Sequence, residues 1–118
     1  MGDIKKLAIL VSGNGSNLQS IIDSINIGEI NANISLVISN IETAFALTRA
    51  KQENLNSAFL NHKNFSSRES FDQALSELLI IHEVDLIVLA GFMRILSNGF
   101  IEKFNRKLIN IHPSLLPL

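Results

Sequence analysis

The sequence contains no cysteine, no tryptophan and no tyrosine, and neither sign of charge dominates it. The absence of cysteine excludes disulfide bonds, thiolate zinc sites and cysteine nucleophiles, and it fits a reducing compartment. Ten Lys and Arg residues stand against eleven Asp and Glu residues, which gives a net charge of −1. Such a balance argues against the basic surface of a nucleic-acid-binding protein, so we expect no nucleic-acid partner.

Long hydrophobic runs are also absent. The apolar stretch after the N-terminus is broken at Ser12 and Gly13, too soon for a signal peptide or a membrane-spanning helix. We therefore expect a cytoplasmic protein with no membrane partner. Apolar residues nevertheless make up 47% of the 118 residues, which is enough for one domain with a buried core.

Short apolar runs alternate with segments of helical periodicity along the chain. The expected strands are residues 7–11, 34–38, 57–60, 86–90 and 108–111. The expected helices begin near Ser16, Ala44, Ser66 and Ser97. Ser16 with Gln19, and Ser66 with Glu69, have the spacing of a capping box. This alternation predicts an α/β fold, an open and mostly parallel sheet with flanking helices, which binds ligands at the carboxyl ends of its strands.

A glycine-rich turn, residues 12–17, joins the first expected strand to the first expected helix. Free backbone amides and the helix dipole favour an anion at such a turn, and Gly13 and Gly15 allow the backbone to approach it closely. The turn lacks the lysine of a Walker loop, and Leu18 stands where a dinucleotide fingerprint has its third glycine. A terminal phosphate therefore fits better than a pyrophosphate. An ordinary turn without a ligand has the same spacing and stays an open alternative.

Asn110 and His112 project from the same face of the last expected strand, because side chains two residues apart share a face. An imidazole can transfer a proton near neutral pH, and an amide can donate a hydrogen bond to a developing oxyanion. The pair suits transfer of an acyl-type group through a tetrahedral intermediate, without an enzyme nucleophile. A single histidine at a strand end is also commonly structural, and that interpretation remains open.

Residues 91–96 follow the fourth expected strand and include four apolar side chains. These side chains could line a pocket for a flat heterocycle, and Arg94 and Arg68 could bind carboxylates. Alternatively, the apolar side chains tuck under the sheet edge and the arginines are solvated. The three histidines do not share a metal-ligand spacing, so we expect no metal site.

Three segments together resemble the phosphoribosylglycinamide formyltransferases, the folate-dependent enzymes of purine synthesis. These segments are residues 12–19, 90–97 and 110–117, and residues 39–40 and 67–69 are also similar and fall in the same order. The resemblance covers almost the whole chain. It implies a Rossmann-like formyltransferase fold and small-molecule substrates. The implied reaction transfers a formyl group from the co-substrate 10-formyltetrahydrofolate to the amine of glycinamide ribonucleotide.

The resemblance also implies roles for individual residues. Gly15, Ser16 and Asn17 would bind the substrate phosphate. The implied folate-binding residues are Arg68, Met93, Arg94, Ile95, Leu96 and Asn110. The implied catalytic residues are Asn110, which would bind the formyl oxygen, and His112, which would donate a proton to the intermediate.

Members of this family are nearly twice as long and place a catalytic aspartate downstream of the His-Pro-Ser segment. Residues 1–118 are thus expected to form the N-terminal, nucleotide-binding part of one formyltransferase domain, incomplete at its C-terminus. We expect impaired catalysis and an exposed sheet edge beside the last strand. Two alternatives remain: a non-catalytic fragment that at most binds a phosphorylated metabolite, and a related folate-dependent formyltransferase or deformylase.

Overall fold

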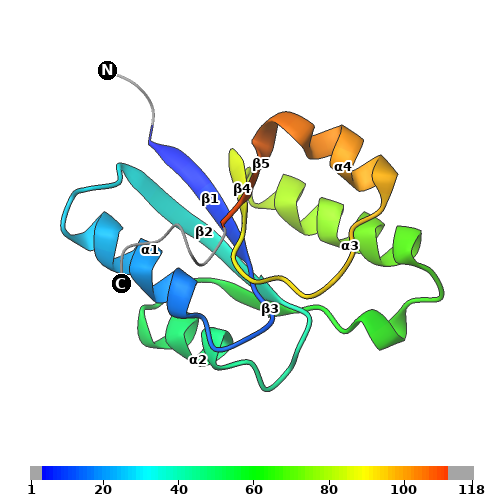
Figure 1. Cartoon of the computed structure of the whole chain (residues 1–118), viewed down its shortest axis with the longest axis horizontal. Coiled ribbons are helices and arrows are strands. Elements are labelled where there is room, and N and C mark those ends of the chain that lie inside the picture. The colour runs from blue at the N-terminus through cyan, green and yellow to red at the C-terminus, as the bar shows by residue number, and fades with distance from the viewer. Residues whose placement is uncertain (1–3, 112–118) are drawn as a thin grey trace.

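The computed structural model describes residues 4–111, which form one parallel sheet with helices on both of its faces (Figure 1). The strands are β1 (Lys5–Leu10), β2 (Ala32–Ser39), β3 (Ser57–Phe59), β4 (Leu86–Leu89) and β5 (Leu108–Asn110). Their order in the sheet is β3-β2-β1-β4-β5, and every neighbouring pair is parallel. The expectation of an open parallel α/β sheet is confirmed.

The helices lie where the periodicity predicted them, within a few residues. They are α1 (Ser16–Asn26), α2 (Phe45–Gln52), α3 (Arg68–Ile81) and α4 (Asn98–Phe104). Two short 3₁₀ helices, η1 (His62–Asn64) and η2 (Asn105–Lys107), were not predicted. No helix in residues 4–111 is long and apolar enough to cross a membrane.

The predicted capping box at Ser16 is wrong. The residue that caps α1 is Gly15, whose φ is 82° and which supplies no side-chain hydrogen bond. Ser16 is the first helical residue, and its amide donates to Oδ1 of Asn14 at 2.9 Å. The asparagine therefore satisfies an amide of the first turn from two residues away, as an Asx turn does.

The capping box of α3 exists, but it lies one residue later than predicted. The Oγ of Ser67 accepts from the amide of Ser70 at 3.1 Å, and the Oγ of Ser70 accepts from the amide of Ser67 at 3.2 Å. The predicted pair was Ser66 and Glu69. Two adjacent serines can both begin a helix, and spacing alone does not choose between them.

Helices bury both faces of the sheet. Successive residues of β1, and Val11 directly after it, point to opposite faces. Leu7, Ile9 and Val11 pack in the core under α1 and α2, whereas Ala8 and Leu10 pack in the core under α3. All five are buried. Burial on both faces explains why this strand is a continuous apolar run rather than an alternating one.

The strand β5 lies at one edge of the sheet. In the described part of the chain, β5 has a neighbouring strand only on its β4 side. On the face of α1 and α2, a hollow of about 280 Å³ is lined by residues of α1, β1, β2, β4 and β5, and Ile109 of β5 there is 42% exposed.

Candidate functional site

The carboxyl ends of β1, β4 and β5 lie next to one another, because these strands are parallel neighbours in the sheet. The segments that follow β1 and β4 are residues 12–17 and 91–96, which we name the Gly-rich loop and the apolar loop. Asn110 is the last residue of β5. The predicted meeting of these segments at one sheet edge is therefore confirmed for every residue up to Ile111.

The Gly-rich loop borders a hollow of about 190 Å³ whose other walls come from Val11, Ala90 and Gly91. Gly15, Ser16 and Asn17, the predicted phosphate-binding residues, all line it. The first amides of a helix have no carbonyl four residues earlier to bind, so this end of α1 has donors for an anion. The predicted residues are thus brought together around a space of suitable size.

Gly15 cannot be replaced without moving its surroundings. A Cβ atom built on Gly15 would lie 2.8 Å from the Cβ of Ala46, on α2, and its φ of +82° already disfavours other residues. The Gly-rich loop and α2 are therefore in direct contact. The loop needs glycine here for space as well as for conformation.

Arg49 of α2 holds the Gly-rich loop from behind. Its Nε donates to the carbonyl oxygen of Asn14 at 2.8 Å, and its Nη1 donates to Oε1 of Gln19 at 3.1 Å. A guanidinium beside the loop also adds positive charge near the candidate anion site. Sequence reasoning missed Arg49, because 35 residues separate it from Asn14 and only the packing of α2 joins them.

The apolar loop borders a larger hollow of about 430 Å³. Its lining residues are Leu89, Phe92, Arg94, Ile95, Leu96, Ile101, Leu108 and Asn110. Four of the six predicted folate-binding residues therefore share one space. Met93, which is 82% exposed, is not part of this lining, and Arg68 is an exposed residue in the first turn of α3 that lines neither hollow.

The apolar loop combines the two expected arrangements, side chains that line a pocket and side chains that tuck under the sheet edge. Leu96 is buried under the sheet edge, whereas Met93 and Ile95 are exposed. Arg94 is half-buried rather than solvated, and its guanidinium carbon lies 4.6 Å from the centre of the Phe71 ring. This cation–π contact orients the arginine at the hollow.

Ser12 connects the Gly-rich loop to the apolar loop. Its Oγ donates to Oδ1 of Asn40 at 2.6 Å and accepts from the amide of Met93 at 2.7 Å. Its own amide donates to the carbonyl oxygen of Gly91 at 3.1 Å. Both polar side chains, Ser12 and Asn40, are buried. Sequence reasoning noted both residues as parts of motifs without detecting that they meet.

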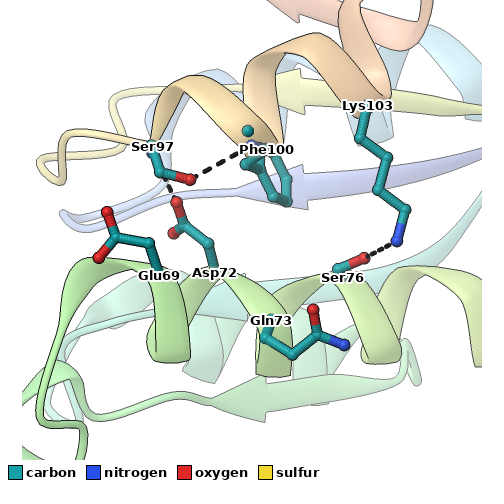
Figure 2. Close-up of a pocket in the computed structure, with 8 residues that line it drawn as sticks. Glu69, Asp72, Gln73, Ser76, Ser97, Phe100 and Lys103 are labelled. Atoms are coloured by element: carbon teal, nitrogen blue, oxygen red, sulfur yellow. Dashed lines mark hydrogen bonds between the residues drawn. The ribbon is translucent and has the colours of Figure 1, made fainter.

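The far end of the apolar loop is fixed by α3. The buried carboxylate of Asp72 accepts from the amide of Ser97, whose Oγ accepts from the amide of Phe100 at 3.2 Å and so caps α4 (Figure 2). This pair borders a third hollow of about 200 Å³ between α3 and α4. In the same hollow Lys103 donates to the Oγ of Ser76 at 2.8 Å, and none of the predicted site residues lines it.

His112, with the rest of the segment up to Leu116, lies outside the described residues, so its catalytic role remains a prediction. The other two histidines lie at the ends of helices and line neither hollow of the candidate site. His82 caps the end of α3, with its Nδ1 at 2.9 Å from the carbonyl oxygen of Leu78, and His62 is a half-buried residue of η1. Within residues 4–111, no group of three or more His, Cys, Asp or Glu side chains could hold a metal ion.

Comparison with known proteins identifies strong relatives. The family model described as formyl transferase matches residues 5–118. A phosphoribosylglycinamide formyltransferase of Haemophilus influenzae is 50% identical over 114 residues, which cover 97% of this chain and 54% of that protein. A human trifunctional purine biosynthetic protein adenosine-3 is 45% identical over 112 residues, 95% of this chain and 11% of that protein.

Solved structures agree with these sequence relatives. The phosphoribosylglycinamide formyltransferase of Coxiella burnetii, solved in complex with CHES, superposes with a TM-score of 0.91 and is 42% identical. The alignment covers 98% of this chain and 54% of that one. The chain thus spans about half the length of the bacterial relatives that it matches, 54% and 52% for those of Haemophilus influenzae and Escherichia coli.

Proposed function

The chain belongs to the formyl transferase family, and from this we propose that it carries the N-terminal part of an enzyme that formylates glycinamide ribonucleotide. The formyl donor is 10-formyltetrahydrofolate, a folate, as the family implies. Both substrates are small molecules, and the reaction belongs to purine synthesis in the cytoplasm. The observation that carries the proposal is that two hollows of different chemistry lie at the carboxyl ends of neighbouring strands of one sheet.

The Gly-rich hollow is suited to the phosphate of the ribonucleotide. Gly15, Ser16 and Asn17 line it at the N-terminus of α1, where helix amides and the helix dipole favour a negative charge. Arg49 adds a cation behind the loop. Ala90 and Gly91, which follow β4, line the same hollow, so we infer that the rest of the ribonucleotide extends toward the end of β4.

The hollow of the apolar loop is suited to the folate. Phe92, Ile95 and Leu96 give it apolar walls for a flat ring system, and Arg94 adds donors at its margin. Met93 and Arg68 lie outside its lining, so contacts from them would be made to parts of the folate that extend beyond the hollow. Asn110 is the polar residue that reaches this hollow from β5.

In the proposed reaction the amine of glycinamide ribonucleotide is the nucleophile. It attacks the formyl carbon, a new carbon–nitrogen bond forms, and the carbonyl oxygen becomes negatively charged. Asn110 donates a hydrogen bond to this oxygen. The carbonyl then re-forms as the bond between the formyl carbon and the folate nitrogen breaks, and His112 donates a proton to that departing nitrogen. The attacking amine loses a proton to solvent, so the products are the formamide and tetrahydrofolate. No covalent enzyme intermediate is needed, which agrees with the absence of cysteine.

Calorimetric titration of the chain with glycinamide ribonucleotide and with the ribonucleoside that lacks the phosphate tests this proposal. Because each charge-assisted hydrogen bond contributes about 1.5–3 kcal/mol, the ribonucleotide should bind at least about tenfold more tightly. Equal affinities for the two compounds would contradict a phosphate site in the Gly-rich loop.

A second candidate function is a non-catalytic module that binds a phosphorylated metabolite. It is favoured by the Gly-rich loop, because residues 13–17 line the candidate anion hollow and the contacts from Ala46 and Arg49 of α2 lie within residues 4–111. The two functions differ in their folate dependence. Binding of tetrahydrofolate beside the ribonucleotide supports the enzyme, whereas binding of the ribonucleotide alone supports the module.

A further inference from the structure

We propose that Ser12 is a positioning residue that couples the Gly-rich loop to the apolar loop, so that ligands in the two hollows bind cooperatively. This inference rests on the proposed function, because it assigns ligands to both hollows. Ser12 itself lines neither of them. It acts through its neighbours in both loops.

The hydrogen bonds of the Ser12 side chain give it this role. A serine hydroxyl has one proton to donate, and here the proton goes to Asn40 at the end of β2. The same oxygen accepts from the amide of Met93, which lies 81 residues away in the apolar loop. The two bonds, at 2.6 and 2.7 Å, are short; the bond to Asn40 is buried and the bond from Met93 is partly buried, and losing a partner at the buried Ser12 side chain is costly.

The position of Ser12 in the chain makes the connection direct. Ser12 begins the Gly-rich loop, and its backbone amide also bonds to the carbonyl oxygen of Gly91. Gly91 lines the same hollow as the Gly-rich loop, whereas Arg94 and Ile95, just past Met93, line the other hollow. A shift of one loop therefore strains the hydroxyl that holds the other.

The opposite end of the apolar loop has an independent anchor. Asp72 accepts from the amide of Ser97, as Figure 2 shows, and this fixes where α4 begins. The loop is thus held at both ends, and only the Ser12 end is joined to the Gly-rich loop. A ligand bound to the preorganised Gly-rich loop restrains Ser12 further and so lowers the cost of ordering the apolar loop, which is how cooperativity arises without a large structural change.

Amide hydrogen exchange on the ligand-free chain tests the contact first. In the wild-type protein the Met93 amide should exchange at least about tenfold more slowly than an unstructured amide. In Ser12→Ala the Met93 amide should exchange roughly three- to tenfold faster than in the wild type. Ser12→Thr keeps the hydroxyl and should restore most of the protection.

The matched control is Ser76→Ala. Ser76 is a buried serine of α3 whose hydroxyl also accepts one hydrogen bond, from Lys103, but it touches neither loop. It should lower stability without changing exchange at Met93. Should Ser12→Ala fail to fold, the wild-type measurement still decides, because an unprotected Met93 amide would overturn the proposal.

The second readout is the cooperativity itself, measured with glycinamide ribonucleotide and tetrahydrofolate. In the wild type each compound should raise the affinity for the other at least about fivefold, and in Ser12→Ala this ratio should fall to about one. A merely structural role would lower both affinities and leave the ratio unchanged, which would overturn the proposal. If neither compound binds the wild type, the proposed function fails, while the exchange data still judge the Ser12 contact.

Discussion

The Gly-rich loop and the apolar loop end neighbouring strands, yet they are built in different ways. The Gly-rich loop takes its shape from backbone conformation and from close packing against Ala46 and Arg49 of α2. The apolar loop is held at the Met93 amide and at the Ser97 amide, while the side chains of Met93 and Ile95 are exposed. One loop is thus preorganised by the protein, and the other presents side chains that a ligand can order.

The difference shows which half of the site is self-sufficient. A preorganised loop binds its ligand without a large entropic cost, whereas exposed apolar side chains gain most of their contacts when something covers them. The proposed phosphate subsite should therefore be sensitive to changes behind the Gly-rich loop. The proposed folate subsite should be sensitive to changes on the surface of the apolar loop.

The largest effect is expected for Gly15→Ala. The new Cβ would lie 2.8 Å from Ala46, and the backbone would have to hold a left-handed conformation that costs about 1–2 kcal/mol. The affinity for glycinamide ribonucleotide should fall at least about tenfold, because the clash with Ala46 displaces the loop and a lost hydrogen bond to a charged group costs about 1.5–3 kcal/mol. Isothermal titration calorimetry measures this change.

The control for Gly15→Ala is Gly28→Ala. Gly28 follows α1 and lies away from the Gly-rich loop. Its φ, +84°, is nearly the same, but a Cβ there would meet open space. Gly28→Ala should lower the free energy of unfolding by a similar amount through its backbone conformation, and it should leave the ribonucleotide affinity unchanged. An equal loss of affinity in both variants would show that general destabilisation, not loop geometry, is responsible.

A smaller effect is expected for Arg49→Met, which removes the hydrogen bonds to Asn14 and Gln19 together with the positive charge. Ribonucleotide affinity should fall about fivefold, and its dependence on salt should weaken. Arg49→Lys keeps the charge, so its ribonucleotide affinity should lie between those of the wild type and Arg49→Met. Lys51→Met, which removes an exposed charge from the same helix, should change little, and an effect as large as that of Arg49→Met would argue against a specific role for Arg49.

The smallest effect on stability is expected in the apolar loop. Met93→Ser and Ile95→Ser should change the free energy of unfolding in urea by less than about 0.5 kcal/mol, because both side chains are exposed. Tetrahydrofolate affinity should fall more for Ile95→Ser, since Ile95 lines the hollow. A clear loss of stability in either variant would mean that this loop is packed like the Gly-rich loop.

Much of the fold follows from patterns that the sequence displays locally. The strand beginning at Leu7 is continuously apolar because both faces are covered, and the helix after Ser97 begins at a serine that caps it. Helix starts were harder to predict. At Ser16 the neighbouring Asn14 satisfies the first turn instead, and at α3 the adjacent Ser67 takes the capping position.

The candidate site was predictable as far as it lies in continuous motifs. Gly15, Ser16 and Asn17 line one hollow, and Arg94, Ile95, Leu96 and Asn110 line the other. The supporting contacts were not predictable, because they join residues far apart in the sequence. Ser12 meets Met93 and Arg49 meets Asn14 only after the strands have paired and α2 has packed.

The most direct test of the account is an NMR titration of the isotope-labelled chain with each proposed ligand in turn. Glycinamide ribonucleotide should shift the amide resonances of residues 15–17, and tetrahydrofolate should shift those of residues 93–96 and Asn110. Shifts confined to the hollow between α3 and α4, or the same set of shifts for both compounds, would contradict two distinct subsites at this sheet edge.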